Sequence, residues 1–247
     1  MSGDSPSGAP TPPVFHPYPK IADSLSGAER DEATARRHAK GTWVATEKIH
    51  GANLCVWGDG HGLRVGKRRR LLEPGETFFD HYQALGPLYA ALDALIQSVQ
   101  ATHAARAVLL HGELFGGAYP HPEVEPVQGV APVQTGVHYC PDVRFAAFDV
   151  AVVTEDDERR FLPLERAFQH LEDASIPTVP ILSRGPLDEM LALPADFLTR
   201  VPAQLGLPEL ADNFAEGLVI RPWDLEPTSP AARPLFKRKR AAFVEAR

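Results

Sequence analysis

The sequence is poor in cysteine, has no long apolar run and carries no excess of positive charge. Its two cysteines, Cys55 and Cys140, provide neither a disulfide framework nor the four-ligand spacing of a zinc site. No segment approaches the ~18 apolar residues of a membrane span, and residues 1–20 contain no apolar core of a signal peptide. Since low cysteine use also fits a reducing compartment, we expect a cytoplasmic protein that does not contact membranes.

The net charge of −7 excludes a generally basic coat for nucleic acid, but it leaves room for a local basic groove. A content of 44% hydrophobic and 23% charged residues is ordinary for a globular protein. Residues 1–14 are rich in Ser, Gly and Pro, which predicts a disordered tail. Residues 15–247 are expected to form one domain, with a short surface helix between Asp23 and Lys40.

Strand patterns outnumber helix patterns along the chain. Alternating or continuous apolar runs predict strands at 43–47, 52–57, 63–67, 108–115, 144–153, 218–221 and 235–239. Helical spacing predicts helices at 82–105, 164–171 and 187–193, whereas proline-rich stretches at 120–132 and 222–234 predict loops. Because strands and helices do not alternate one for one, we expect an α+β fold with antiparallel sheet.

The segment Glu47-Lys48-Ile49-His50-Gly51-Ala52-Asn53 places a lysine between two predicted strands. An uncharged lysine amine can attack a phosphate and store an activated nucleotide as a phosphoramidate. Gly51 would let the backbone approach a ligand closely. Taken alone, however, Lys48 is more simply interpreted as a solvated surface lysine.

Five further segments combine residue types that suit nucleotide chemistry. Lys67–Arg70 could bind polyphosphate, Glu113 in the strand 111–117 could hold a ribose or metal, and Phe148 in 145–150 could stack on a base. Glu216 enters an apolar strand that ends at Arg221, and period two places Lys237 and Lys239 on one face of a strand, with Arg238 and Arg240 on the other. Each segment also has a purely structural interpretation, as a charged surface run, a core aromatic or a basic tail.

The order of the six segments resembles that of the covalent nucleotidyltransferase superfamily, which includes RNA ligases, DNA ligases and capping enzymes. The motifs K-x-H-G, a glutamate strand, an aromatic strand, E-G-x-V-x-R and K-x-K follow one another from Lys48 to Lys239. His50, Asn53 and the Lys67-Arg68 pair make the chain most similar to the T4 RNA ligase 2 family, over residues 15–245. The resemblance implies a nucleotidyltransferase (ATP-grasp-like ligase) domain, with antiparallel sheets flanked by helices and the active site in the groove between them.

By this resemblance, Lys48 is the nucleophile that takes AMP from ATP. The nucleotide-binding residues that the resemblance implies are Glu47, Lys48, Ile49, Asn53, Arg68, Glu113, Phe148, Glu216, Val219, Arg221, Lys237 and Lys239. Among them Glu47 and Ile49 would contact adenosine, Phe148 would stack on adenine, and Lys237 and Lys239 would bind the α-phosphate. Glu216 would also help to hold Mg²⁺ or Mn²⁺.

The implied function is an ATP-dependent RNA ligase that joins 3′-OH and 5′-phosphate ends, with nicked duplex RNA as partner and RNA repair as the role. Family members commonly carry a C-terminal accessory domain, whereas this sequence ends soon after Lys239. We therefore expect no such domain here and a protein partner that replaces it. The alternatives are a DNA ligase, a capping-type guanylyltransferase, or a degenerate module that only binds nucleotide or nucleic acid.

Overall fold

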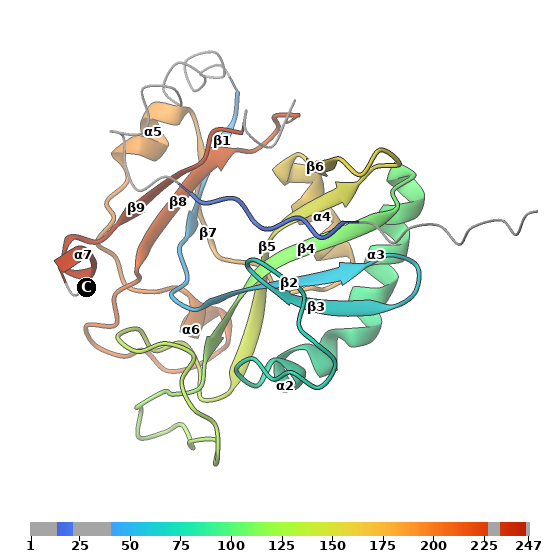
Figure 1. Cartoon of the computed structure of the whole chain (residues 1–247). Coiled ribbons are helices and arrows are strands. Elements are labelled where there is room, and N and C mark those ends of the chain that lie inside the picture. The colour runs from blue at the N-terminus through green and yellow to red at the C-terminus, as the bar shows by residue number, and fades with distance from the viewer. Residues whose placement is uncertain (1–13, 22–40, 227–232, 246–247) are drawn as a thin grey trace, which may run out of the picture.

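The computed structural model describes residues 14–21, 41–226 and 233–245, and these form two antiparallel sheets (Figure 1). Most of the predicted tail and the helix predicted between Asp23 and Lys40 lie outside the described residues. The four-stranded sheet has the order β7-β1-β8-β9. Its strands are β1 (Trp43–Glu47), β7 (Ile181–Gly185), β8 (Gly217–Pro222) and β9 (Phe236–Lys239).

The five-stranded sheet has the order β3-β2-β4-β5-β6. Its strands are β2 (Ala52–Gly58), β3 (Leu63–Lys67), β4 (Ala107–Gly116), β5 (Val143–Val153) and β6 (Arg159–Phe161). All named strand pairs are antiparallel, which confirms the predicted α+β class. The seven predicted strands are all present, whereas β6 and β7 were not predicted.

The helices flank the sheets, and α3 is the longest of those described. They are α2 (His81–Leu85), η1 (Gly86–Leu88), α3 (Tyr89–His103), α4 (Leu164–Asp173), α5 (Leu187–Ala192), α6 (Val201–Gln204) and α7 (Ala241–Glu245). The single helix predicted over 82–105 was wrong, because Gly86 and Pro87 form a 3-10 turn between α2 and α3. Proline has no N–H for a helical hydrogen bond, so this turn separates the two helices. Within the described part of the chain, no helix has the length and apolar content needed to cross a bilayer.

Each face of β2 packs against a different core, as its period-two pattern predicted. Leu54 and Val56 belong to the core between the five-stranded sheet and helices α2, α3 and α4. Cys55 and Trp57 face the opposite side, where Tyr18 of the N-terminal segment covers the sheet. In Figure 1 this segment, drawn in dark blue, runs across the molecule between the two sheets.

The link between β1 and β2 carries the chain from one sheet to the other, because β1 belongs to the four-stranded sheet and β2 to the five-stranded sheet. This link consists of residues 48–51 and starts with Lys48. The backbone N–H of Lys48 donates to the Gly217 carbonyl at 2.9 Å, which ties the link to the start of β8. Lys48 is therefore held at the junction of the two sheets.

Candidate active site

A cavity of about 890 Å³ opens at this junction and is lined by residues of both sheets. Its volume lies within the range of small-molecule sites, roughly 300–1,000 Å³. All predicted site residues except Glu47 are among the described residues that line it: Lys48, Ile49, Asn53, Arg68, Glu113, Phe148, Glu216, Val219, Arg221, Lys237 and Lys239. The structure therefore brings these residues together in the groove between the sheets, where the resemblance places the active site.

Lys48 enters this cavity from the link after β1. Its Nζ donates to Glu216 Oε2 at 2.6 Å, and its side chain is 21% exposed. Gly51 makes the tight link possible, since a Cβ at this position would lie 2.0 Å from the Leu114 carbonyl oxygen. The structure thus holds the predicted nucleophile by both its backbone and its amine.

Glu216 is the anionic centre of the site and is only 2% exposed. Besides Lys48, it pairs with Lys239 Nζ through Oε1 at 2.7 Å, and His50 Nδ1 lies 3.4 Å from Oε2. Burial would raise the pKa of Glu216, but hydrogen bonds and charges from His50, Lys48 and Lys239 outweigh it and lower the pKa to about 2. Glu216 is therefore ionised at neutral pH and orients two ammonium groups.

Asn53 and Glu113 lie opposite each other on β2 and β4. Burial, with a smaller contribution from the charge of Glu216, raises the pKa of Glu113 to about 7 against the opposing charge of Lys48. Asn53 Oδ1 is buried and makes no hydrogen bond within the described residues. Because buried polar atoms are nearly always paired, this oxygen is available to a donor on a bound ligand.

Phe148 forms an aromatic wall of the cavity together with Tyr18. The Phe148 and Tyr18 rings meet edge to face with centroids 5.2 Å apart, and the Tyr18 hydroxyl donates to Asp149 Oδ2 at 2.9 Å. Tyr18 and the three residues that follow it also line the cavity. A half-buried ring in this position can stack on a base.

Glu47 and Arg221 make contacts that were not predicted. The carboxylate of Glu47 accepts hydrogen bonds from the Thr199 hydroxyl and the Arg200 backbone N–H, and burial raises its pKa. Glu47 does not line the cavity in the described chain, so this geometry does not support its predicted contact with adenosine. Arg221 lines the cavity but is 2% exposed, and its Nη1 lies 3.3 Å from Asp149 Oδ2.

Only some of the basic residues after β3 and in β9 line the cavity. Lys237 and Lys239 both line it, as the period-two pattern of the strand predicted. Arg240 also lines it, so its predicted placement on the opposite face was wrong: β9 ends at Lys239 and the alternation ends with it. The Arg240 guanidinium lies 3.9 Å from the ring centroid of Phe214.

Two residues of the site carried no signal that sequence reasoning used. The Tyr139 hydroxyl accepts a hydrogen bond from the His50 backbone N–H at 2.7 Å, and Tyr139 comes from the loop between β4 and β5. Phe243 of α7 lines the cavity and meets the His50 ring edge to face at 4.6 Å. Both contacts depend on how segments far away in sequence, a loop and the helix α7, pack beside His50, which no local pattern specifies.

The donor set in the cavity fits a metal ion that arrives with a polyphosphate. No cluster of three metal-ligating side chains exists among the described residues. Two carboxylates, Glu113 and Glu216, face the cavity, and Mg²⁺ sites commonly use one or two carboxylates plus substrate phosphates and water. The assignment of Glu216 as a metal ligand stays a prediction, since both of its oxygens contact lysine amines.

Known proteins with similar sequences are RNA ligases. RNA-editing ligase 2, mitochondrial, of Trypanosoma brucei brucei is 30% identical over 226 residues, which cover 82% of this chain and 54% of that protein. RNA-editing ligase 1, mitochondrial, of the same organism is 33% identical over 236 residues, which cover 84% of this chain and 50% of that protein. The chain therefore spans about half the length of these curated relatives.

Solved structures show the same fold at lower identity. A variant of Naegleria gruberi RNA ligase with AMP and Mn superposes with a TM-score of 0.62 at 18% identity, over 95% of this chain and 60% of that one. A second variant, with ATP and Mn, gives a TM-score of 0.59 at 19% identity, over 95% and 59%. The sequence profile described as RNA ligase matches residues 41–239, from two residues before β1 to the last residue of β9, and the chain therefore belongs to the RNA ligase family.

Proposed function

We propose that this chain is an ATP-dependent RNA ligase that acts through a covalent lysyl-AMP intermediate at Lys48. The observation that carries the proposal is the position of the Lys48 amine. It points into a nucleotide-sized cavity, is held by Glu216 at 2.6 Å, and shares that carboxylate with Lys239 of β9, the edge strand of the same sheet. Such an arrangement presents one amine and a second cation to the same phosphate.

The first step forms a bond between Lys48 Nζ, as the neutral amine, and the α-phosphorus of ATP, and the two protons that the ammonium group loses overall pass to solvent. The bond from that phosphorus to its bridging oxygen breaks, and pyrophosphate leaves. Glu216, with a pKa of about 2, is a poor proton acceptor at neutral pH, so it serves to orient Lys48 and Lys239. A bound Mg²⁺ or Mn²⁺ would neutralise charge on the polyphosphate.

The side chains around Lys48 account for recognition of the nucleotide. Phe148 stacks on the adenine, while Asn53 Oδ1 and Glu113 accept hydrogen bonds from the nucleoside. Lys237 and Lys239 bind the α-phosphate as negative charge develops there, and Arg68 binds the phosphates from the five-stranded sheet. Glu216 holds Lys239 in place before the reaction, so this cation stabilises the transition state without rearrangement.

The two later steps transfer AMP and seal the strand. A 5′-phosphate oxygen of the nucleic acid attacks the α-phosphorus and frees Lys48, and the 3′-OH then attacks the activated 5′-phosphate and releases AMP. We propose nicked duplex RNA as the substrate and RNA repair as the role, with a protein partner that aids strand binding. Membership of the RNA ligase family supports RNA over DNA, while the trypanosome relatives are RNA-editing ligases by name.

The decisive experiment is incubation of the protein with α-³²P-labelled ATP and magnesium. We expect the wild type to take up an acid-labile label and Lys48→Ala to take up none. Lys48→Arg is the matched control, because it keeps a cation beside Glu216 but removes the primary amine. If Lys48→Ala is still labelled while its melting temperature equals that of the wild type, the proposal is wrong.

Substrate choice needs a second measurement on the same protein. Label from GTP rather than ATP would indicate a capping-type guanylyltransferase. Nicked duplexes with either an RNA or a DNA 3′-OH end separate the two kinds of ligase, and we expect sealing of the RNA end. A protein that binds ATP but forms no adduct would be a degenerate nucleotide-binding module.

A further inference from the structure

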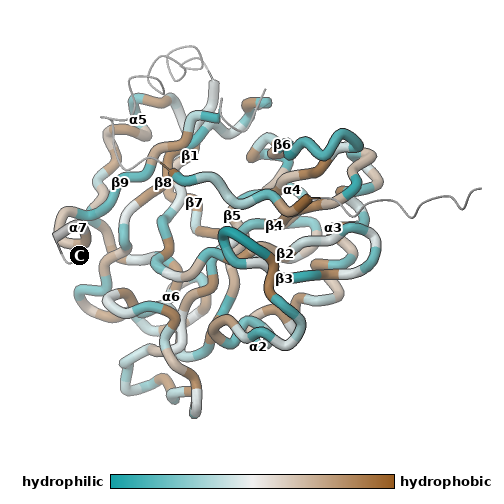
Figure 2. Tube along the Cα trace, in the orientation of Figure 1, coloured by the Kyte–Doolittle hydropathy of each residue, from teal (hydrophilic) through white to brown (hydrophobic). Residues whose placement is uncertain are grey.

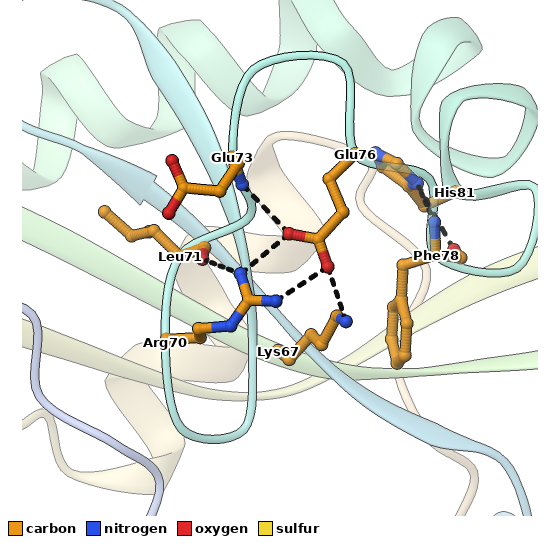
Figure 3. Close-up of polar contacts among 7 residues, drawn as sticks. All are labelled: Lys67, Arg70, Leu71, Glu73, Glu76, Phe78 and His81. Atoms are coloured by element: carbon orange, nitrogen blue, oxygen red, sulfur yellow. Dashed lines mark hydrogen bonds and ion pairs between the residues drawn. The ribbon is translucent and has the colours of Figure 1, made fainter.

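The basic run Lys67–Arg70 at the end of β3 divides into residues with different partners. Figure 2 shows the chain at this turn in the hydrophilic colour. Arg68 lines the ATP cavity, whereas Lys67 and Arg70 both contact the carboxylate of Glu76 (Figure 3). Two of the cations that the sequence offers to phosphates are therefore paired with a side chain of the same loop.

The contacts of Glu76 are those of an anion in a binding site. Oε1 lies 2.6 Å from Lys67 Nζ and 2.8 Å from Arg70 Nη2. Oε2 lies 2.7 Å from Arg70 Nη1 and accepts the backbone N–H of Glu73 at 3.0 Å. A bidentate guanidinium, an ammonium and a backbone N–H are also the donors that bind a phosphate. We call Lys67, Arg70 and the Glu73 N–H the anion cradle.

The cradle is held by contacts that do not involve the Glu76 side chain. The Lys67 N–H donates to the Arg70 carbonyl, and the Leu72 N–H donates to the Val65 carbonyl, both at 2.8 Å. The Lys67 amine also lies 5.2 Å from the ring centroid of Phe78. Lys67 and Arg70 would therefore stay together if the Glu76 carboxylate moved out.

The cradle is also open to solvent. The side chain of Arg70 is 51% exposed and that of Lys67 is 33% exposed, so an external anion can reach both. Ion pairs this exposed are screened by salt and contribute little to stability. Replacing one anion by another at this site therefore costs little free energy, unlike at Glu216.

We propose that the anion cradle is a binding site for a backbone phosphate of the RNA substrate, and that Glu76 occupies it until RNA displaces the carboxylate. This inference rests on the proposed function, because it takes RNA as the ligand. Arg68 lies between the two cradle cations in sequence and lines the ATP cavity, so the strand held by the cradle passes close to the reacting nucleotide. Glu76 thus lowers the affinity for RNA and weakens its salt dependence.

The test compares Glu76→Gln with the wild type in binding a fluorescent nicked RNA duplex over a series of salt concentrations. Removal of the competing charge should tighten binding about 3- to 10-fold, and each phosphate newly bound should steepen the log–log salt slope by about 0.9. Glu73→Gln is the matched control, since it removes the same charge from the same loop. In Figure 3 the Glu73 carboxylate points away from Lys67 and Glu76.

Arg70→Gln provides the second arm. Since Arg70 is partly occupied by Glu76 in the wild type, its loss should cost much more affinity in the Glu76→Gln background than in the wild type. If Glu76→Gln binds RNA no more tightly than Glu73→Gln, or more weakly than the wild type, Glu76 only shapes the loop and the inference is overturned.

The adenylylation assay distinguishes failure of the proposed RNA site from failure of the proposed ligase function. Glu76→Gln should take up label from ATP at the wild-type rate, because Glu76 does not line the ATP cavity in the described residues. If the wild type takes up AMP and binds nicked RNA, but Glu76→Gln has no effect on RNA binding, only the inference about the anion cradle is wrong. If the wild type binds no RNA, both the proposed substrate and the proposed ligand of the anion cradle are wrong.

Discussion

Asp149→Asn should destabilise the protein strongly, because Asp149 compensates two buried arginines. Asp149 Oδ2 lies 2.6 Å from Arg233 Nη2 and 3.3 Å from Arg221 Nη1, and it accepts the Tyr18 hydroxyl at 2.9 Å. The Asp149 side chain is fully buried, and those of Arg221 and Arg233 are 3% and 7% exposed. The substitution keeps the shape and one acceptor but removes the negative charge that lies beside both guanidinium groups.

The size of the effect follows from the cost of an uncompensated buried charge. Removal of one partner from a buried ion pair costs roughly 3–5 kcal/mol. Because the asparagine oxygen can still accept from Tyr18, we expect the lower end, about 3 kcal/mol. In a protein of this size each kcal/mol shifts the melting temperature by about 2–4 °C, so Asp149→Asn should melt about 6–12 °C lower.

Thermal and urea denaturation of the whole chain, followed by circular dichroism, measures this loss. Asp142→Asn is the matched control, because Asp142 pairs with Arg144 at the surface with 39% and 46% of the two side chains exposed. It should change stability by no more than about 1 kcal/mol. Equal, small losses in Asp149→Asn and Asp142→Asn would refute the view that Asp149 is the counter-charge of the buried arginines.

Two further substitutions test the site. Tyr139→Phe leaves the His50 N–H without its acceptor, so the rate of labelling by ATP should fall about tenfold, which corresponds to roughly 1.4 kcal/mol. Single-turnover labelling at saturating ATP measures this rate. An unchanged rate would contradict the role of the hydroxyl. For Glu113, burial raises the pKa from 4.5 to about 7 in the folded state, which therefore binds protons more tightly than the unfolded chain. The contribution of Glu113 to stability should therefore fall as pH rises from about 4.5 to 7, so the melting temperature of Glu113→Gln should rise relative to that of the wild type across that range.

The elements that local patterns specify were predicted well. The strands around Lys48, Glu113 and Phe148 have the expected positions, because apolar periodicity in a strand reflects its two packing faces. The three-residue strand β6 and the strand β7 were missed. Both form because β5 and β1 offer edges to pair with, and that depends on residues far away in sequence.

In the site too, some features could be predicted from local sequence and others could not. Lys48, Glu216 and Lys239 were predicted from their motifs and come together within hydrogen-bonding distance. The partners of Glu47 and Arg221 were not predictable, since each side chain is satisfied by a residue from a distant part of the chain: Thr199 and Asp149 respectively. A motif identifies which residue type is needed at a position, whereas the direction of its side chain depends on what packs beside it.

Glu216 and Glu76 illustrate how burial changes the meaning of the same contact. Each carboxylate pairs with two cations, and each stands where a phosphate could bind. Glu216 is 2% exposed, so moving it would leave two lysines beside a buried space without a counter-charge, and it must remain in place during the reaction. Glu76 is 22% exposed and its cations can be compensated by solvent ions, so an RNA phosphate can replace it. Loss of charge at Glu216 should therefore reduce the rate of adenylylation, while the same change at Glu76 should alter RNA affinity alone.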